Sequence, residues 1–291
     1  MGLKRTLIIL IAVIYGCIFC SITNAAWDGP IRIVSGGFGS GDLQFGIRYS
    51  GSGDVFPRKI IVLMNGDIWI PDGYVNKRLK LYDKNGSLKK IITYDKSTKS
   101  FPEYWFIGNF ESINKEGNIY MSDYMGEDVF ALYSPTGALL QTYAERPLEL
   151  GKVKNNSRGD GTYDVIAKYP DVTYEFVSDQ PMDTYYRDNQ DLLYRVDSFI
   201  VDGPQGAAIN AYKVYVYNTC GREVSVLNMP LSEYEILPKS AFDRPTTKEI
   251  PIIEYGEPLV GPNGNVYCWA RTKTEYKILK WTWQDDPSNP V

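Results

Sequence analysis

The sequence predicts an all-β protein, a propeller of four-stranded antiparallel blades whose ring is closed by an N-terminal strand. Three observations predict this fold class: a unit that repeats about every 50 residues, tight turns between short apolar segments, and no long segment with helical spacing. The chain of 291 residues is long enough to bury a large core without disulfide bonds.

The repeat is clearest in two segments of seven residues. Residues 66–72 read GDIWIPD and residues 117–123 read GNIYMSD, which is an offset of 51 positions. The same offset aligns Tyr82 with Tyr133, so that one register holds beyond the matching segments. A constant register over this length indicates a repeated supersecondary unit.

Four short strands are expected within the first unit. They are predicted at residues 59–63, 68–70, 79–81 and 88–94. Residues 64–67 (MNGD) have the composition of a tight hairpin turn, and residues 83–86 (DKNG) form a second turn. Four strands joined by hairpins make one antiparallel sheet, which is the blade of a propeller.

A third clear copy lies near the C-terminus, where residues 261–269 read GPNGNVYCW and a strand follows at 276–283. Two degenerate units are expected before it. Their second strands are predicted at 172–177 and 212–217, and residues 222–227 and 234–237 are expected to continue the latter blade.

The ends of the chain are expected to close the ring. Residues 31–34 (IRIV) stand alone before the first unit, and we expect them to form the outer strand of the last blade, since pairing would cover an open sheet edge. The span 31–283 divides into five steps of about 51 residues, which predicts five blades. Six blades are possible if the irregular stretch 146–206 contains another.

The N-terminus has the features of an export signal, which we assign to residues 1–25 and which precedes a single domain at 27–291. Lys4 and Arg5 are followed by an apolar run of 14 residues and then by small residues suited to cleavage. The run is shorter than the roughly 20 residues of a membrane-spanning helix. An uncleaved anchor and lipidation at Cys17 remain alternatives. The expected location is the periplasm, the cell envelope or the extracellular space.

Composition excludes several classes of site. The chain has no histidine, which excludes serine–histidine and cysteine–histidine catalytic pairs and histidine-ligated zinc. Carboxylate chemistry and calcium bound by oxygen ligands remain possible. Removing Lys4 and Arg5 with the signal leaves 29 basic and 35 acidic residues, a net charge of −6, and no basic stretch suggests nucleic acid as a partner.

Two cysteines remain outside the signal. Cys220 and Cys268 could pair as a disulfide bond in an oxidising compartment. Spacing along the chain does not establish that the two thiols are close.

The repeats resemble NHL-type repeats of the six-bladed propeller group. That pattern has a proline before the first strand, a Gly-Asn-Ile-Tyr-Val-x-Asp element, an Asn-x-Arg-Ile element, and then an aromatic residue and a glycine turn. Pro57, residues 66–72, residues 76–79, Tyr82 and Gly86 match it here. The resemblance implies a propeller, often with a binding role, and it carries over no active site.

Candidate binding residues lie near the ends of the second strands. Asp72 and Asp123 occupy equivalent positions, where a carboxylate can cap backbone N–H groups of the next turn, so that a structural role is favoured. Aromatic rings beside carboxylates also suit a peptide or sugar ligand, although tyrosines can pack between blades. The predicted binding residues are Asp72, Tyr74, Asp123, Tyr124, Asp179 and Arg271.

We expect a non-enzymatic binding or scaffold protein for a protein, peptide or glycan, without a cofactor. The alternative is a calcium-dependent hydrolase, because lactonase-type propellers hold calcium in the central channel with Glu, Asn and Asp. Glu111 and Asn114 are the candidate calcium ligands under that alternative. A third option is a structural module whose tyrosine-rich surface mediates self-association.

Overall fold

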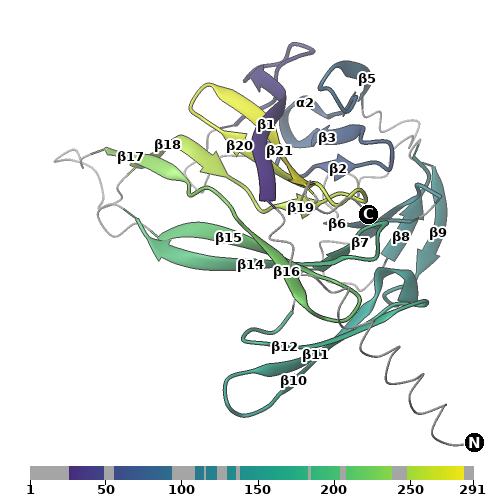
Figure 1. The fold of residues 1–291 in the computed structure, drawn as a ribbon. Helices are drawn as coiled ribbons and strands as arrows, with labels where there is room; N and C mark the ends of the chain where they lie inside the picture. The colour runs from purple at the N-terminus through teal and green to yellow at the C-terminus, as the bar shows by residue number, and fades with distance from the viewer. Residues whose placement is uncertain are drawn as a thin grey trace, which may run out of the picture.

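The computed structural model describes residues 26–48, 56–93, 109–114, 116–122, 130–135, 138–182, 185–203, 208–237 and 248–284. They form five antiparallel sheets arranged in a ring, which is a five-bladed propeller (Figure 1). Helical structure in this part of the chain is limited to one turn, α2 (Gly73–Asn76), and a 3-10 turn, η1 (Leu148–Leu150). The prediction of an all-β propeller is confirmed, with five blades rather than six.

Blades 1 and 2 follow the repeat. Blade 1 contains β2 (Ile61–Val62), β3 (Ile68–Asp72), β4 (Arg78–Tyr82) and β5 (Leu88–Thr93), and blade 2 contains β6 (Asn109–Ile113), β7 (Ile119–Ser122), β8 (Phe130–Tyr133) and β9 (Leu139–Tyr143). Ile68 pairs with Tyr82 in blade 1, and Ile119 pairs with Tyr133 in blade 2. The 51-residue offset therefore joins equivalent positions of neighbouring blades.

The turn glycines of the repeat take a conformation that other residues rarely adopt. Gly66, Gly117 and Gly264 have φ values of 83°, 81° and 75°. An L-residue with a side chain is strained in this left-handed region, so the turn between the first two strands of each unit selects glycine.

Blades 3 and 4 depart from the prediction. Blade 3 has three strands, β10 (Lys152–Ser157), β11 (Tyr163–Lys168) and β12 (Thr173–Ser178), and blade 4 has β13 (Tyr185–Arg187), β14 (Leu193–Asp202), β15 (Ala208–Tyr217) and β16 (Glu223–Asn228). Residues 172–177 and 212–217 were predicted as second strands. They lie instead in the third strand of each sheet, so this assignment is wrong.

The second strand of blade 4 follows a turn that lacks glycine. Asp188 accepts hydrogen bonds from the backbone N–H groups of Gln190 and Leu192, as Asn114 does from those of Glu116 and Asn118. Asp191 stands where Gly117 stands in blade 2 and has a φ of 62°. Aspartate tolerates this conformation better than most residues, so the turn is kept although its sequence signature is lost.

Blade 5 joins the two ends of the chain. It contains β17 (Glu233–Leu237), β18 (Lys248–Tyr255), β19 (Leu259–Val260), β20 (Val266–Arg271), β21 (Glu275–Gln284) and β1 (Ala26–Gly37). Residues 234–237 were expected in the preceding blade; that expectation is wrong, because β17 pairs with β18. Figure 1 shows β1 beside β21 at the outer edge of this sheet, so the predicted closure is confirmed.

The closing strand β1 makes apolar contacts near both of its ends. Val34 pairs with Ile278 and is buried in one core cluster with Phe45 and Tyr276. At the other end of β1, the Trp27 ring lies 5.6 Å from that of Trp283. β1 therefore contributes apolar burial as well as backbone hydrogen bonds.

The predicted disulfide bond is not formed. Both cysteines are free: Cys220 is exposed in the β15–β16 turn, and Cys268 is buried within β20. The Cys268 thiol lies 3.1 Å from the Gly256 carbonyl oxygen, in a core cluster that includes Val214 and Val216 of blade 4. The predicted signal, residues 1–25, lies outside the described residues, and no helix within the described ranges is long and apolar enough to cross a membrane.

Candidate functional site

Asp72 lies in a buried network at the end of β3. Its carboxylate accepts hydrogen bonds from the Gly46 backbone N–H at 2.8 Å, from Asn76 Nδ2 at 2.9 Å and from Arg78 Nε at 2.9 Å. Only 1% of Asp72 is exposed. These contacts favour a structural role over contact with a ligand.

The two cations beside Asp72 hold the connection between β1 and β2. Arg78 donates to the carbonyl oxygens of Ser40, Gly41 and Gln44, and Lys80 also donates to Gln44. The Lys80 ammonium lies 4.3 Å from the centroid of the Phe45 ring. Burial lowers the pKa of Lys80 to about 8, although the Asp72 carboxylate opposes this shift.

Of the remaining predicted binding residues, the structure describes the side chains of Arg271 and Asp179. Arg271 is buried, donates to Glu254 at 2.5 Å and lies over the Phe56 ring. Asp179 is exposed, 3.7 Å from the guanidinium of Arg195, in blade 3. The Tyr74 side chain and residues 123 and 124 (Asp123 and Tyr124) lie outside what the structure describes.

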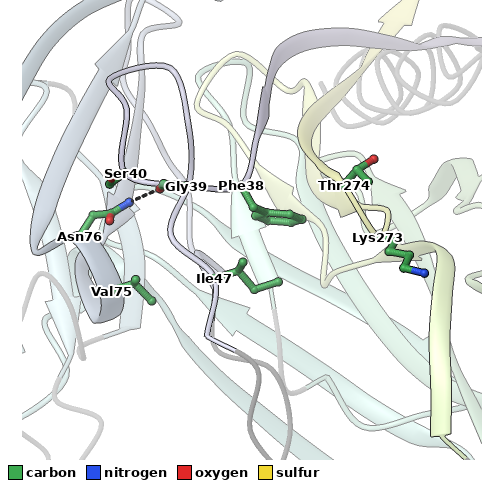
Figure 2. Close-up of a pocket in the computed structure, with 8 residues that line it drawn as sticks. All are labelled: Phe38, Gly39, Ser40, Ile47, Val75, Asn76, Lys273 and Thr274. Carbon is green, nitrogen blue, oxygen red and sulfur yellow. Dashed lines mark hydrogen bonds between the residues drawn. The ribbon is translucent and has the colours of Figure 1, made fainter.

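A pocket of about 490 Å³ lies near Asp72 and Arg271, and we call it the exit-end pocket. Figure 2 shows its lining, which comes from the β1–β2 connection, from α2 and from the β20–β21 turn: Phe38, Gly39, Ser40, Ile47, Val75, Asn76, Lys273 and Thr274. Asn76 links α2 to the β1–β2 connection at this pocket by donating a hydrogen bond to the Gly39 carbonyl oxygen at 2.9 Å. The only charged residue in this lining is Lys273.

A larger cavity of about 770 Å³ is lined from four of the five blades, and we call it the turn-end cavity. Met64 of the β2–β3 turn contributes to it, whereas Val75 and Asn76 of the β3–β4 connection line the exit-end pocket. Successive connections of an antiparallel sheet lie at opposite ends of its strands. The two hollows therefore lie at opposite ends of blade 1.

Arg146 is fixed against the wall of the turn-end cavity. Its guanidinium donates to Glu111 Oε2 at 2.9 Å and to the Gly151 carbonyl oxygen at 3.3 Å. Its Cζ lies 5.5 Å from the centroid of the Tyr185 ring and 5.7 Å from that of Phe130. The ion pair and the stacking together hold this planar group in one orientation.

Arg187 forms a second fixed group in the same cavity. It donates to both carboxylate oxygens of Asp171, at 2.6 and 2.9 Å, and also to Asp191. Its Cζ lies 5.0 Å from the centroid of the Tyr169 ring. Burial disfavours the charged form of Arg187, but the two carboxylates outweigh that effect and raise its pKa.

The tyrosines of the cavity stay protonated at neutral pH. Burial raises the pKa of Tyr169 and of Tyr185, even though the neighbouring Arg146 lowers both values. Tyr185 donates its hydroxyl hydrogen to the Gly151 carbonyl oxygen at 3.0 Å. β13 therefore presents Tyr185, Tyr186 and Arg187 to the cavity as aromatic and cationic groups that are held in place.

Glu111 and Asn114, the candidate calcium ligands, both line the turn-end cavity. Glu111 accepts hydrogen bonds from Ser122 and Arg146 through its two oxygens, and the Asn114 side-chain oxygen accepts the N–H groups of its own turn. Within the described ranges, no group of three or more Cys, Asp or Glu residues could hold a metal ion. Both carboxylate oxygens of Glu111 and the side-chain oxygen of Asn114 thus already accept hydrogen bonds.

Sequence reasoning did not identify the centre of this site. Residues 185–191, none of which was among the predicted site residues, contain β13 and the cavity turn. The Asp188 carboxylate is buried: desolvation raises its pKa, while the Leu192 N–H and the Tyr194 hydroxyl oppose the rise. One feature of the sequence could have predicted this turn: Asp188 and Asp191 have the same spacing as Asn114 and Gly117 in the corresponding turn of blade 2.

Comparisons with known proteins show only distant similarity. No family model and no curated protein matches the sequence, so the resemblance to NHL repeats stays a prediction. A solved structure of a DUF4221 family member from Bacteroides vulgatus is 10% identical, with 91% of this chain and 98% of that chain covered and a TM-score of 0.28. A structure of BBS1N in complex with ARL6DN is 11% identical, covering 77% and 78%, with a TM-score of 0.25.

A third similar structure is MPT-1, a GDP-Man-dependent mannosyltransferase from Leishmania mexicana. It is 13% identical, with 74% of this chain and 79% of that chain covered and a TM-score of 0.25. Identities and TM-scores this low carry no function from any of these proteins to this chain.

Proposed function

We propose that the chain is an exported, non-enzymatic binding protein whose ligand, a protein, peptide or glycan, occupies the turn-end cavity. The observation that carries the proposal is the cavity itself: about 770 Å³, lined from four blades, with its arginines already fixed by carboxylates and aromatic rings. Small-ligand sites are typically pre-formed hollows of about 300–1,000 Å³ with a few placed polar groups. A site ordered before binding avoids part of the entropy cost of association.

The lining favours binding over catalysis. The residues described in this cavity include no serine, threonine, cysteine, lysine or histidine that could act as a nucleophile. Glu111, Asp171 and Asp191 are each held by an arginine in an ion pair.

The direct test is binding of the purified protein to peptide and glycan arrays, together with pull-down from envelope extract. Arg187→Met removes one of the two cavity guanidinium groups, and Lys273→Ala at the exit-end pocket is the matched control. We expect a signal that Arg187→Met abolishes and Lys273→Ala retains. No signal with the native protein, or a signal that both variants retain, would overturn the assignment.

The calcium-dependent hydrolase is the alternative use of the same cavity. Its support is the position of Glu111 and Asn114 on the lining, and the hydrogen bonds that occupy their oxygens weigh against it. Stoichiometric calcium in the purified protein, together with turnover of lactones or esters that Glu111→Gln abolishes, would replace the binding proposal with this one.

Export is tested separately. The mature N-terminus is expected at Ala26 or Trp27 in a fraction outside the cytoplasm, because small residues precede both positions. Recovery of the chain with its first 25 residues in the cytoplasmic fraction would contradict export without affecting the cavity.

A further inference from the structure

We propose that the turn-end cavity takes a neutral, hydroxyl-rich ligand, that is, a short uncharged glycan. The inference rests on the proposed function and narrows its ligand class. It depends on three features of the lining: both arginines are already paired with carboxylates, polar groups keep donors and acceptors side by side, and aromatic rings lie between them.

Both arginines of the cavity are paired with carboxylates before any ligand arrives. Arg146 is paired with Glu111, and Arg187 with Asp171 and Asp191. An anionic ligand would have to displace a carboxylate from a partly buried guanidinium, which leaves the displaced group poorly paired. A ligand without charge leaves both ion pairs intact.

The carboxylates of the lining outnumber the arginines. Each carboxylate that is not paired with an arginine is either buried and hydrogen-bonded or exposed to solvent. Asp188 is buried, and its two oxygens accept hydrogen bonds from the Gln190 and Leu192 N–H groups and from Tyr194. Glu116 and Glu149 are exposed. The interior therefore has no buried carboxylate, among the described residues, that requires a cation from the ligand.

The paired groups keep hydrogen-bonding capacity of both kinds. The Asp191 side chain is 52% exposed, so it can accept further hydrogen bonds from a ligand. Arg146 Nη2 lies 3.5 Å from the Leu150 carbonyl oxygen, which is a long contact, so this group can donate to a ligand. A sugar hydroxyl both donates and accepts, so adjacent hydroxyls can satisfy a carboxylate and a guanidinium together.

Aromatic surface is available beside these polar groups. Tyr185 and Tyr186 are neighbours on β13 and are half-buried, and Met64 and Ile113 add apolar surface from blades 1 and 2. Tyrosine rings offer a flat apolar face with a polar tip. The C–H face of a pyranose ring matches such a surface, whereas a strongly hydrated ion does not.

The test compares ligands by charge, using isothermal titration of the purified protein. Neutral gluco-, manno- and N-acetylglucosamine oligomers are set against oligogalacturonate, deacetylated glucosamine oligomers and lysine-rich peptides. We expect at least one neutral series to bind at least about tenfold more tightly than every charged ligand, which is a difference of about 1.4 kcal/mol.

The key variant is Asp171→Ala, which leaves Arg187 paired with Asp191 alone. It should weaken binding of the neutral glycan at least about tenfold, because Arg187 loses the bidentate partner that fixes its orientation, and it should improve binding of oligogalacturonate, because the cavity loses one negative charge. Asp164→Ala is the matched control, because it breaks the exposed Arg158–Asp164 pair (2.7 Å) in the same blade and should bind as the native protein does. Thermal unfolding of both variants establishes that they are folded.

The outcomes separate this inference from the broader proposal. Tightest binding of a charged ligand or of the peptide, lost in Asp171→Ala, would overturn the glycan assignment and leave the binding function standing. Neutral glycan binding that Asp171→Ala does not change would show that the cavity is not the site. Absence of binding by every ligand and on the arrays would overturn both proposals.

Discussion

The exit-end network around Asp72 and the turn-end cavity use the same chemistry for different purposes. At the exit end, Asp72 lies between Arg78 and Lys80, and all three residues are at most 7% exposed. At the turn end, Arg187 pairs with Asp171 and Asp191, whose side chains are about half exposed. Burial distinguishes the two groups: one holds the β1–β2 connection in place, and the other keeps open hydrogen-bonding positions in a cavity.

The largest effect is expected from Asp72→Ala. The substitution leaves Arg78 and Lys80 buried without their carboxylate, and breaking a buried pair costs about 3–5 kcal/mol of unfolding free energy. Urea unfolding followed by tyrosine and tryptophan fluorescence measures the loss. A loss below about 1 kcal/mol, the range of exposed pairs, would show that the network does not hold this end of the blade.

A smaller effect is expected at the other end. Asp171→Ala should cost less than about 1 kcal/mol of unfolding free energy, because the carboxylate is half exposed and solvent screens the pair. The same unfolding experiment makes the comparison with Asp72→Ala direct. Equal losses for the two variants would remove the distinction between a structural and a binding ion pair.

The pH dependence of stability also distinguishes the exit-end network from the turn-end cavity. Burial lowers the pKa of Lys80 and of Lys59 to about 8 from an ordinary value near 10.5. Between these values the unfolded chain binds more protons than the folded chain, so stability should rise with pH from about 8 to 10.5. Lys80→Met should reduce that rise.

The buried tyrosines make stability fall, rather than rise, as the pH increases. Burial raises the pKa of Tyr174 to about 12, and its hydroxyl donates to the Asp191 carbonyl oxygen at the turn end. Its contribution is complete below pH 10 and is lost as pH rises from about 10 to 12, because the unfolded tyrosine ionises first. Tyr174→Phe should reduce the loss in that window. Slopes that neither variant changes would contradict these assignments.

The fold was predictable where local geometry restricts the choice of residue. The left-handed turns at Gly66, Gly117 and Gly264 require residues that leave a visible repeat, and the closing strand followed from the open edge that a ring must cover. Blade 4 was misassigned because Asp191 adopts the same turn without glycine.

The site was less predictable, because it depends on contacts between blades. Nothing local places the β11–β12 turn, with Tyr169 and Asp171, against β13 and Arg146. Asp72 was interpreted as more structural than catalytic, and its partner Gly46, which precedes it by 26 residues, belongs to the β1–β2 connection. The sequence predicted that the Asp72 carboxylate would cap backbone N–H groups of the following turn. It accepts the backbone N–H of Gly46 instead.

The central claim is a ring closed by β1 against β21, and a cross-link tests it most directly. Ser35 and Lys277 are directly paired across this seam, whereas Lys280 pairs with Ile31 and lies three residues, about 10 Å, further along β21. In a background with Cys17, Cys20 and Cys220 replaced by serine, Ser35→Cys with Lys277→Cys should form a disulfide bond under mild oxidation. Ser35→Cys with Lys280→Cys should not, because a disulfide bond needs Cα atoms within about 7 Å.

The readout is the mobility of each variant on a non-reducing gel, together with its melting temperature. The account predicts a cross-linked, thermally stabilised chain for the matched pair alone. No cross-link, or equal cross-linking in both variants, would contradict the closed five-bladed ring.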